Sequence, residues 1–152
     1  MGDTHRVVNK VKLVAKAVLI NEKGMVLILT RSATDVVRPG QLDLPGGGID
    51  KEDASYSAAV LREIREEAGL ELSEDDIKLV FTDTSYFDGQ TTIRFLYAAS
   101  ISSTVPITLS YEHSEQHWMN MAQVESEYNH PVWVKGIKYA VQHNLLPATI
   151  TP

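Results

Sequence analysis

The chain has 152 residues, of which 43% are hydrophobic and 22% charged, a composition typical of one folded globular domain spanning residues 1–152. Its formal net charge of −6 disfavours binding to a nucleic acid polymer or an anionic membrane, because the phosphates of either would not be neutralised. The chain has no cysteine, which excludes disulfides, thiolate nucleophiles and Cys-bound zinc.

The N-terminal segment from Met1 to Arg6 is polar and lacks the apolar core of a secretion signal. It also misses the myristoylation pattern, because Arg6 stands where Ser or Thr is required. No apolar run approaches the roughly 20 residues of a membrane-spanning helix. We therefore expect a cytoplasmic protein with no membrane partner.

Residues 11–20 and 25–30 are rich in β-branched and other apolar residues, which predicts two strands. The short turn between them, residues 21–24, ends in a glycine that can adopt a positive φ angle. We expect a β-hairpin buried on much of both faces. Residues 31–43 are predicted to form a connecting loop, which ends in a short extended piece at Leu42–Leu44.

A glycine-rich turn, Pro45-Gly46-Gly47-Gly48, follows this loop and precedes a helix predicted over residues 55–67. Asp53 or Ser55 is the expected N-cap of the helix, because both side chains can accept a hydrogen bond from its first turn. Gly69 is well placed to end the helix.

Acidic and apolar residues occupy separate arcs of this helix. With Glu63 as the origin and about 100° per residue, Glu66 lies at roughly 300° and Glu67 at roughly 40°. Three carboxylates on one stripe repel each other, so we expect a positive partner there, and a divalent cation with oxygen ligands is suitable. The apolar residues lie from about 60° to 160°, on the face expected to pack against a sheet: Val60, Leu61, Ile64 and Ala68.

The second half of the chain is predicted to contain three strands followed by two helices. A turn at Asp88-Gly89 separates the first two of these strands. Strands, a helix, strands and helices in this order indicate a mixed sheet packed between helices. The strands are residues 77–82, 91–101 and 106–109, and the helices are residues 121–127 and 134–143.

Two further groups of residues have both a structural and a functional interpretation. Tyr86, Phe87 and Tyr97 could stack on a nucleobase, but aromatic residues of strands usually belong to the core, and we expect core positions. His113 and His117 have the i,i+4 spacing of a metal site but lack the zincin pattern between them, which favours surface or structural roles.

The segment from Gly47 to Leu70 resembles the Nudix box, whose pattern is G-x5-E-x7-R-E-U-x-E-E-x-G-U with U an aliphatic residue. The approach to the box, residues 38–45, is also similar to that family, with Leu42 where an aromatic residue is common. The order of the predicted elements extends the resemblance to most of the chain. The second half of the box matches at every fixed position: Arg62, Glu63, Ile64, Glu66, Glu67, Gly69 and Leu70.

The first half of the box departs from the pattern. Counting back from Arg62 places the early glutamate of the box at Ala54 and its first glycine at Gly48. Counting forward from the Pro45–Gly47 run places that acid at Asp53 and leaves one extra residue before Arg62. We favour the second register, because it keeps a carboxylate at the early position, although not as a direct metal ligand.

The resemblance implies an α+β fold, an α/β/α sandwich with a mixed β-sheet between helices. It also implies a hydrolase that cleaves the diphosphate linkage of a nucleoside diphosphate derivative or a nucleoside triphosphate with Mg²⁺ or Mn²⁺ as cofactor. The implied partner is therefore a small-molecule nucleotide, and a homodimer is common in related proteins.

The resemblance also implies roles for residues of the box. Glu63 and Glu67 are the leading metal ligands, Glu66 is a third ligand or orients water, and the backbone carbonyl of Gly46 completes the coordination. A pair between Arg62 and Glu66 on a helix surface would contribute only about 0.2–0.5 kcal/mol, too little to explain the arginine as a stability device. Its implied role is to orient a catalytic glutamate.

Other candidate site residues lie outside the box helix. Family members often recruit a general base from a distant loop, and Glu112 and Glu115 are equal candidates to accept a proton from the attacking water. Arg31 and Arg38 either contact substrate phosphates or are solvated loop residues. Without Cβ atoms, Gly47 and Gly48 allow the backbone to approach a phosphate or metal.

Two alternatives on the same fold remain open. One is a non-catalytic module that binds or senses a nucleotide, which would bind without forming a product. The other is a diphosphate isomerase, which is disfavoured by the absence of cysteine and would release a rearranged, still phosphorylated product. The intact acids of the second half of the box favour the hydrolase.

Overall fold

The computed structural model describes residues 10–143, so the two ends of the expected domain, residues 1–9 and 144–152, lie outside the described part. These ends include the N-terminal segment that was expected to lack a targeting signal. The described strands form one seven-stranded sheet: β1 (Lys10–Ile20), β2 (Val26–Arg31), β3 (Leu42–Asp43), β4 (Gly46–Gly48), β5 (Lys78–Phe87), β6 (Gln90–Ser100) and β7 (His113–Met119).

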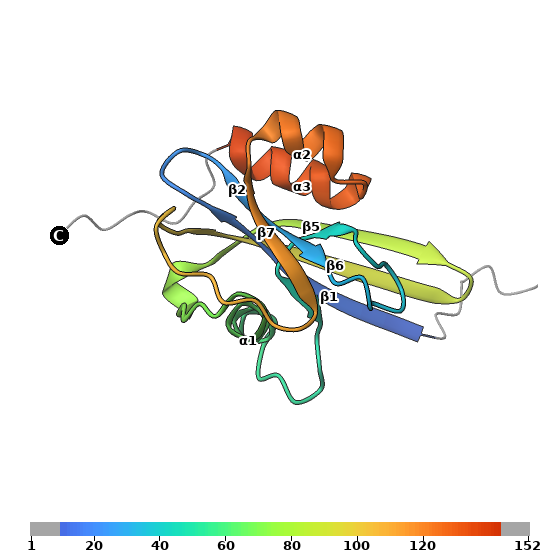
Figure 1. Cartoon of the computed structure of the whole chain (residues 1–152). Helices are drawn as coiled ribbons and strands as arrows, with labels where there is room; N and C mark the ends of the chain where they lie inside the picture. Colours follow the sequence, from blue (N-terminus) through green and yellow to red (C-terminus); the bar gives the residue numbers. More distant parts are fainter. Residues whose placement is uncertain (1–9, 144–152) are drawn as a thin grey trace, which may run out of the picture.

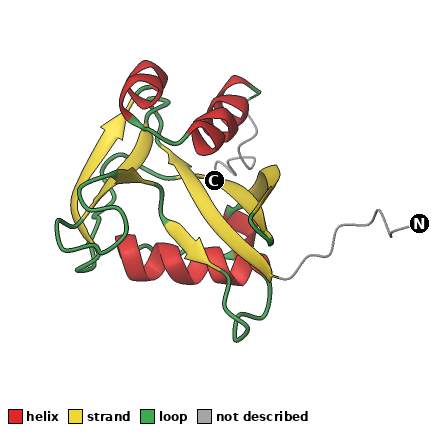
Figure 2. Cartoon of the chain, turned by 90° about the vertical axis from the view of Figure 1, so that its right-hand side faces the viewer, coloured by secondary structure: helices red, strands yellow, loops and turns green. Residues whose placement is uncertain are grey.

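The sheet is mixed, as the sequence predicted. Its main path runs β3-β2-β1-β6-β5, with β4 paired to β1 and β7 paired to β2. Strands β1 and β6 are parallel over their whole length, whereas the other pairs are antiparallel. Helix α1 (Tyr56–Ala68) covers one face, and α2 (Met121–Glu127) and α3 (Pro131–Gln142) cover the other. Figure 2 shows the same three layers from the side.

Strand β1 lies in the middle of the sheet because both of its faces are apolar. Successive side chains of a strand point to opposite faces. Ala17 and Leu19 therefore pack under α1, while Val18 and Ile20 pack under α2 and α3. The buried hairpin expected from the sequence is present, and Gly24 takes a φ of +75° in its turn. However, β1 and β2 share only the pair Ile20–Val26, because β4 occupies the continuation of that edge of β1.

Helix α1 begins and ends where the sequence predicted. The Ser55 side chain accepts a hydrogen bond from the Ala58 amide at 3.0 Å, so Ser55 rather than Asp53 is the N-cap. Gly69 ends the helix in the left-handed region at a φ of +69°, where its amide donates to the Arg65 carbonyl. The buried residues Val60, Ile64 and Ala68 form the face that packs on the sheet.

Two predictions from sequence were wrong, and one strand was missed. The glycine-rich turn is strand β4, since its backbone pairs with β1 from Val14 to Lys16. Residues 106–109 form no strand, although Ile107 and Leu109 pack against the α1 side of the core. Strand β7 was not predicted, because its residues are mostly polar and its stability comes from pairing with β2.

The remaining elements agree with the predictions, apart from their lengths. The helix α2 has the predicted bounds, and α3 begins three residues earlier than predicted, at Pro131. Strand β5 is longer than predicted, and the turn at Asp88-Gly89 joins it to β6.

The aromatic residues and histidines divide between core and surface. Tyr97 is buried, whereas Phe87 is 84% exposed beside Tyr86 at the end of the β5–β6 hairpin, so the prediction of core positions was wrong for this pair. His113 is buried and His117 is not. Among residues 10–143, no helix combines the length and apolarity that a membrane crossing requires.

Candidate active site

The carboxylates of α1 meet the glycine strand β4 at the edge of β1. The Glu67 side chain is buried, and its Oε2 accepts a hydrogen bond from the Gly46 amide at 2.9 Å. Gly46 has a φ of +138°, and a Cβ there would lie 2.3 Å from the Ala15 carbonyl oxygen and 2.5 Å from the Lys16 Cα. Only glycine can therefore bring this amide to Glu67.

Gly47 makes a similar approach to the second carboxylate. A Cβ on Gly47 would lie 3.0 Å from Oε1 of Glu63, so the missing side chain leaves this carboxylate against the backbone of β4. The charge of Glu63 in turn raises the pKa of Glu67, so the two carboxyls are close neighbours. Gly48, the third glycine of the strand, is exposed and pairs with Val14.

Burial disfavours the charged form of both carboxylates. It raises the pKa of Glu67 to about 8, despite the hydrogen bond from Gly46 and the nearby charge of Lys16. Burial also raises the pKa of Glu63, against the opposing charge of Arg62. The positive charges of Arg62 and Lys16 therefore do not offset the effect of burial on the two carboxyls.

Arg62 joins the acids of α1 to the loop before the helix. Its guanidinium donates to both Asp53 oxygens at 2.9 and 3.1 Å, to Glu63 at 3.1 Å and to Glu66 at 3.2 Å. Asp53 thus faces Arg62, which suits an orienting role better than a direct ligand role. The pair of Arg62 with Glu66 was expected, whereas the two bonds to Asp53 were not.

The donor set of this site fits a hard divalent cation. Glu63 and Glu67 supply neighbouring carboxylate oxygens, and a cation beside them would relieve the cost of their burial. Within residues 10–143, no three Asp, Glu or His side chains converge as a complete cage. A Mg²⁺ or Mn²⁺ ion would then complete its shell with backbone or substrate oxygens and water, which is usual for Mg²⁺.

The two candidate general bases lie on or beside β7. The Glu115 side chain is 63% exposed and lies 3.1 Å from Nε2 of His117. Glu112 precedes the strand, and its carbonyl accepts a hydrogen bond from the Ser32 amide. Within the described chain, neither carboxylate is joined by a hydrogen bond or ion pair to Glu63 or Glu67.

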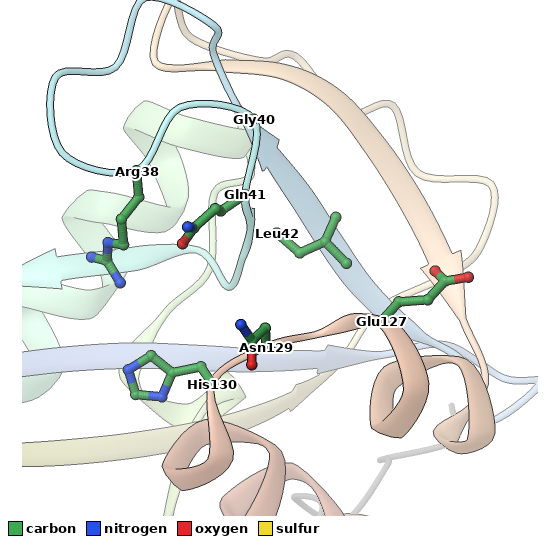
Figure 3. A pocket seen from close by; sticks show the side chains of 7 residues that line it. All are labelled: Arg38, Gly40, Gln41, Leu42, Glu127, Asn129 and His130. Atoms are coloured by element: carbon green, nitrogen blue, oxygen red, sulfur yellow. The ribbon is translucent and has the colours of Figure 1, made fainter.

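The two candidate phosphate-binding arginines have different surroundings. Arg31 is held between Asp43, at 2.8 Å, and Asp35, so two carboxylates already neutralise it. Arg38 lines a pocket of about 280 Å³ between the loop before β3 and the connection of α2 to α3 (Figure 3). The other lining residues are Gly40, Gln41, Leu42, Glu127, Asn129 and His130.

Sequence reasoning missed several polar residues beside the site. Lys16 and Asp43 are both buried, and they form an ion pair at 2.7 Å. Asp43 stands alone between Leu42 and Leu44, and that signal was readable in the sequence, whereas Lys16 is one of three lysines in β1. The pocket residues Asn129 and His130 gave no comparable signal, because they come together with Gln41 only in the folded chain.

Comparisons with known proteins agree with this architecture. A MutT protein from Methanosarcina mazei Go1 superimposes with a TM-score of 0.74 at 23% identity, over 89% of this chain and 96% of its own. The NUDIX domain of Shewanella oneidensis NrtR, solved with ADP ribose, superimposes with a TM-score of 0.66 at 23% identity, over 83% and 85% of the two chains. These likenesses confirm the expected α/β/α sandwich with its mixed sheet.

A sequence relative and a family match address the family directly. The uncharacterized Nudix hydrolase NudL of Enterobacter sp. (strain 638) is 42% identical over 53 residues. That match covers 34% of this chain and only 28% of the relative's length. The NUDIX domain family matches residues 10–139, which is most of the chain and includes β4 and α1. This chain therefore belongs to the Nudix hydrolase family.

Proposed function

We propose that this protein is a metal-dependent pyrophosphohydrolase, which cleaves the diphosphate linkage of a nucleoside diphosphate derivative or a nucleoside triphosphate. The observation that carries the proposal is the buried Glu67 beside the partly buried Glu63, both against the glycine strand β4. Neighbouring carboxyls whose pKa values burial raises are costly to keep in a fold, and they suit a site that binds a cation together with an anionic substrate.

The residues of α1 and β4 hold the cofactor and orient its ligands in this proposal. Glu63 and Glu67 hold the ion, with Glu66 and the Gly46 carbonyl as further oxygen donors. Bound Mg²⁺ or Mn²⁺ supplies positive charge, which neutralises the nonbridging phosphate oxygens and stabilises the leaving oxygen. Arg62 fixes the direction of the Glu63 carboxylate, and Asp53 fixes Arg62 through two hydrogen bonds.

Residues outside the box complete the proposed chemistry. Glu115 or Glu112, both of which are exposed, accepts the proton of the attacking water. The substrate group beyond the diphosphate enters the pocket that Arg38 lines, where Gln41 and Asn129 offer amide donors and acceptors. Arg31 serves the structure of the neighbouring loop rather than the substrate, because two aspartates already engage it.

The test is product formation from a panel of nucleoside diphosphate derivatives and nucleoside triphosphates, including ADP-ribose, with Mg²⁺. Mass spectrometry in ¹⁸O-labelled water identifies the product and the phosphorus that is attacked. The wild type and the control variant Glu71→Gln, an exposed glutamate beyond α1, are expected to cleave the same panel member. The variant Glu67→Gln is expected to lose cleavage.

Other outcomes contradict the proposal. Near-normal cleavage by Glu67→Gln would remove Glu67 from the mechanism. Tight binding of a panel member without any product would support the non-catalytic nucleotide-binding module. A rearranged product that keeps both phosphates would support the isomerase.

A further inference from the structure

Four charged side chains form a continuous row from the core to the loop between β2 and β3. Lys16 donates to Asp43 Oδ1 at 2.7 Å, and Arg31 donates to Asp43 Oδ2 at 2.8 Å. The other end of the Arg31 guanidinium donates to Asp35. The charges alternate along the row, so each aspartate holds the next cation in place.

The inner end of the row is rigid. Asp43 is 2% exposed, its Oδ1 also accepts from the Leu44 amide at 2.9 Å, and Lys16 donates to the Leu44 carbonyl at 3.3 Å. Lys16 pairs in register with Gly46, and its Cγ would lie 2.8 Å from a Cβ on that glycine. The row is therefore fixed to the strand segment that presents its amide to Glu67.

At the outer end of the row, Asp35 stabilises a turn whose valine side chains are exposed. Oδ1 of Asp35 accepts hydrogen bonds from the amides of Val37, at 2.9 Å, and Arg38, at 2.7 Å. The Val36 side chain is 96% exposed, and Val37 is also exposed, so neither contributes a buried contact to this segment. Asp35 is thus the main described anchor of the turn that leads into Arg38.

Arg38 extends from this turn into the pocket and toward His130 (Figure 3). Burial lowers the pKa of His130, and the charges of Arg94 and Arg38 lower it further. His130 is therefore neutral at pH 7, and Arg38 supplies the cation among the residues that line the pocket. The guanidinium can donate to an oxygen of a ligand there.

We propose that Asp35 is a positioning residue for substrate selection, which sets Arg38 in the pocket and is itself held by Asp43 through Arg31. Arg38 then donates to an acceptor oxygen of the substrate group beyond the scissile diphosphate. This inference rests on the proposed function for its substrate, but the ordering of the turn by the charge row does not depend on any ligand.

The ligand-free part is tested by amide hydrogen exchange, measured by NMR on the whole chain. Asp35→Ala is expected to accelerate exchange at Val37 and Arg38 by about tenfold or more, because both amides lose their acceptor. Asp43→Asn is expected to accelerate the same two amides to a smaller degree. Asp75→Ala, which removes an exposed aspartate of the 3₁₀ helix Glu74–Asp76, is the matched control.

Unchanged exchange at Val37 and Arg38 in Asp35→Ala would overturn the proposal. Thermal unfolding of each variant identifies a general loss of stability, which would accelerate exchange throughout the sheet rather than in the turn alone. Asp35 lies on a loop and is only partly buried, which makes Asp35→Ala the decisive variant if Asp43→Asn fails to fold.

The functional part is tested by a double-mutant cycle on KM and kcat, with ADP-ribose and nucleoside triphosphates as probes. Arg38→Ala is expected to raise KM about tenfold, and Asp35→Ala about three- to tenfold, with kcat changed less than about twofold. In the Arg38→Ala background, Asp35→Ala is expected to add nothing, because the residue it positions is absent. Lys78→Ala, which removes an exposed charge at the start of β5, is the control for loss of a cation.

Additive effects in the cycle would overturn the positioning role, since Asp35 would then act without Arg38. A loss confined to kcat would also overturn it. If the wild type cleaves no probe, the proposed function fails, while amide exchange still decides whether Asp35 and Asp43 order the turn.

Discussion

The two clusters of buried charge in this protein differ in their balance. On α1, Glu67 is buried beside the partly buried Glu63, burial raises the pKa of both, and Arg62 reaches only Glu63. In the row from Lys16 to Asp35, every buried carboxylate faces a cation. The second cluster is therefore neutralised by residues of the chain itself, whereas the first suits the cation of the proposed function.

The same difference appears in the pKa values. The cations Lys16 and Arg31 keep the pKa of Asp43 below its usual value, although burial acts in the opposite direction. Burial prevails at Glu67 and raises its pKa. A buried carboxylate with a lowered pKa therefore marks the structural cluster, and one with a raised pKa marks the candidate active site.

Among the predicted changes, the loss of the Glu67 carboxylate should reduce activity most. Glu67→Gln is expected to lower turnover at least about a hundredfold, because an amide cannot replace a carboxylate that holds a divalent cation. The fold should remain intact, since glutamine has nearly the same size and keeps an oxygen that can accept from the Gly46 amide. Circular dichroism and steady-state kinetics check this prediction, and unfolding of the variant would show that Glu67 is structural.

A change in the row from Lys16 to Asp35 should instead lower the stability of the fold. Asp43→Ala is expected to lower the free energy of unfolding by about 3–5 kcal/mol, because it leaves the buried Lys16 and the half-buried Arg31 without their partner. Urea unfolding measures the change. The double variant Asp43→Leu with Lys16→Met should recover much of the loss, and no recovery would mean that the row is not an independent charge cluster.

A smaller effect concerns the orientation of the acids. Arg62→Lys is expected to weaken activation by Mg²⁺ about 10- to 100-fold, because lysine cannot bond both Asp53 oxygens and Glu63 at once. The Mg²⁺ dependence of the rate measures it. Asp53→Asn should give a related but weaker loss, and an unchanged Mg²⁺ dependence in both variants would contradict the orienting role.

The weakest predicted effect is a dependence of stability on pH, which the raised pKa of Glu67 should cause. The pKa of Glu67 is about 8 in the folded chain against its usual 4.5, so between these values the folded state keeps a proton that the unfolded chain has lost. The stability that this group contributes without metal is therefore present at low pH and is lost as pH rises through this window. Thermal unfolding in EDTA from pH 5 to pH 9 measures the slope.

Two comparisons make the pH experiment decisive. Glu67→Gln should flatten the slope, because the titrating group is removed. Added Mg²⁺ should stabilise the wild type more at pH 8 than at pH 5, since a cation competes with the proton on Glu67. Stability that rises with pH across the window in the metal-free wild type would contradict the burial of an unpaired carboxylate.

The sequence was informative where contacts are local. The cap at Ser55, the stop at Gly69 and the turn at Asp88-Gly89 depend on neighbouring residues, and the structure confirms all three. The acidic arc of α1 also followed from helical spacing alone. The family resemblance then identified the box, which the family match supports.

Contacts between distant segments were not predictable in the same way. Strand β7 consists mostly of polar residues, and it exists because β2 offers a free edge far away in the chain. The β4 glycines form a strand because Lys16 and Ala15 lie beside them. The partners of Asp43 come from other strands, so a single charge in an apolar segment indicated a buried pair without identifying its partner.

The long parallel pair of β1 with β6 has a consequence for how the chain folds. It joins Lys10 to Gln90 at one end and Ile20 to Ser100 at the other, so most of the chain lies in the loop that this ladder closes. Contacts so distant in sequence are slow to form, whereas the β5–β6 hairpin closes locally. During synthesis, β1 leaves the ribosome first but cannot take its central place until β6 has followed.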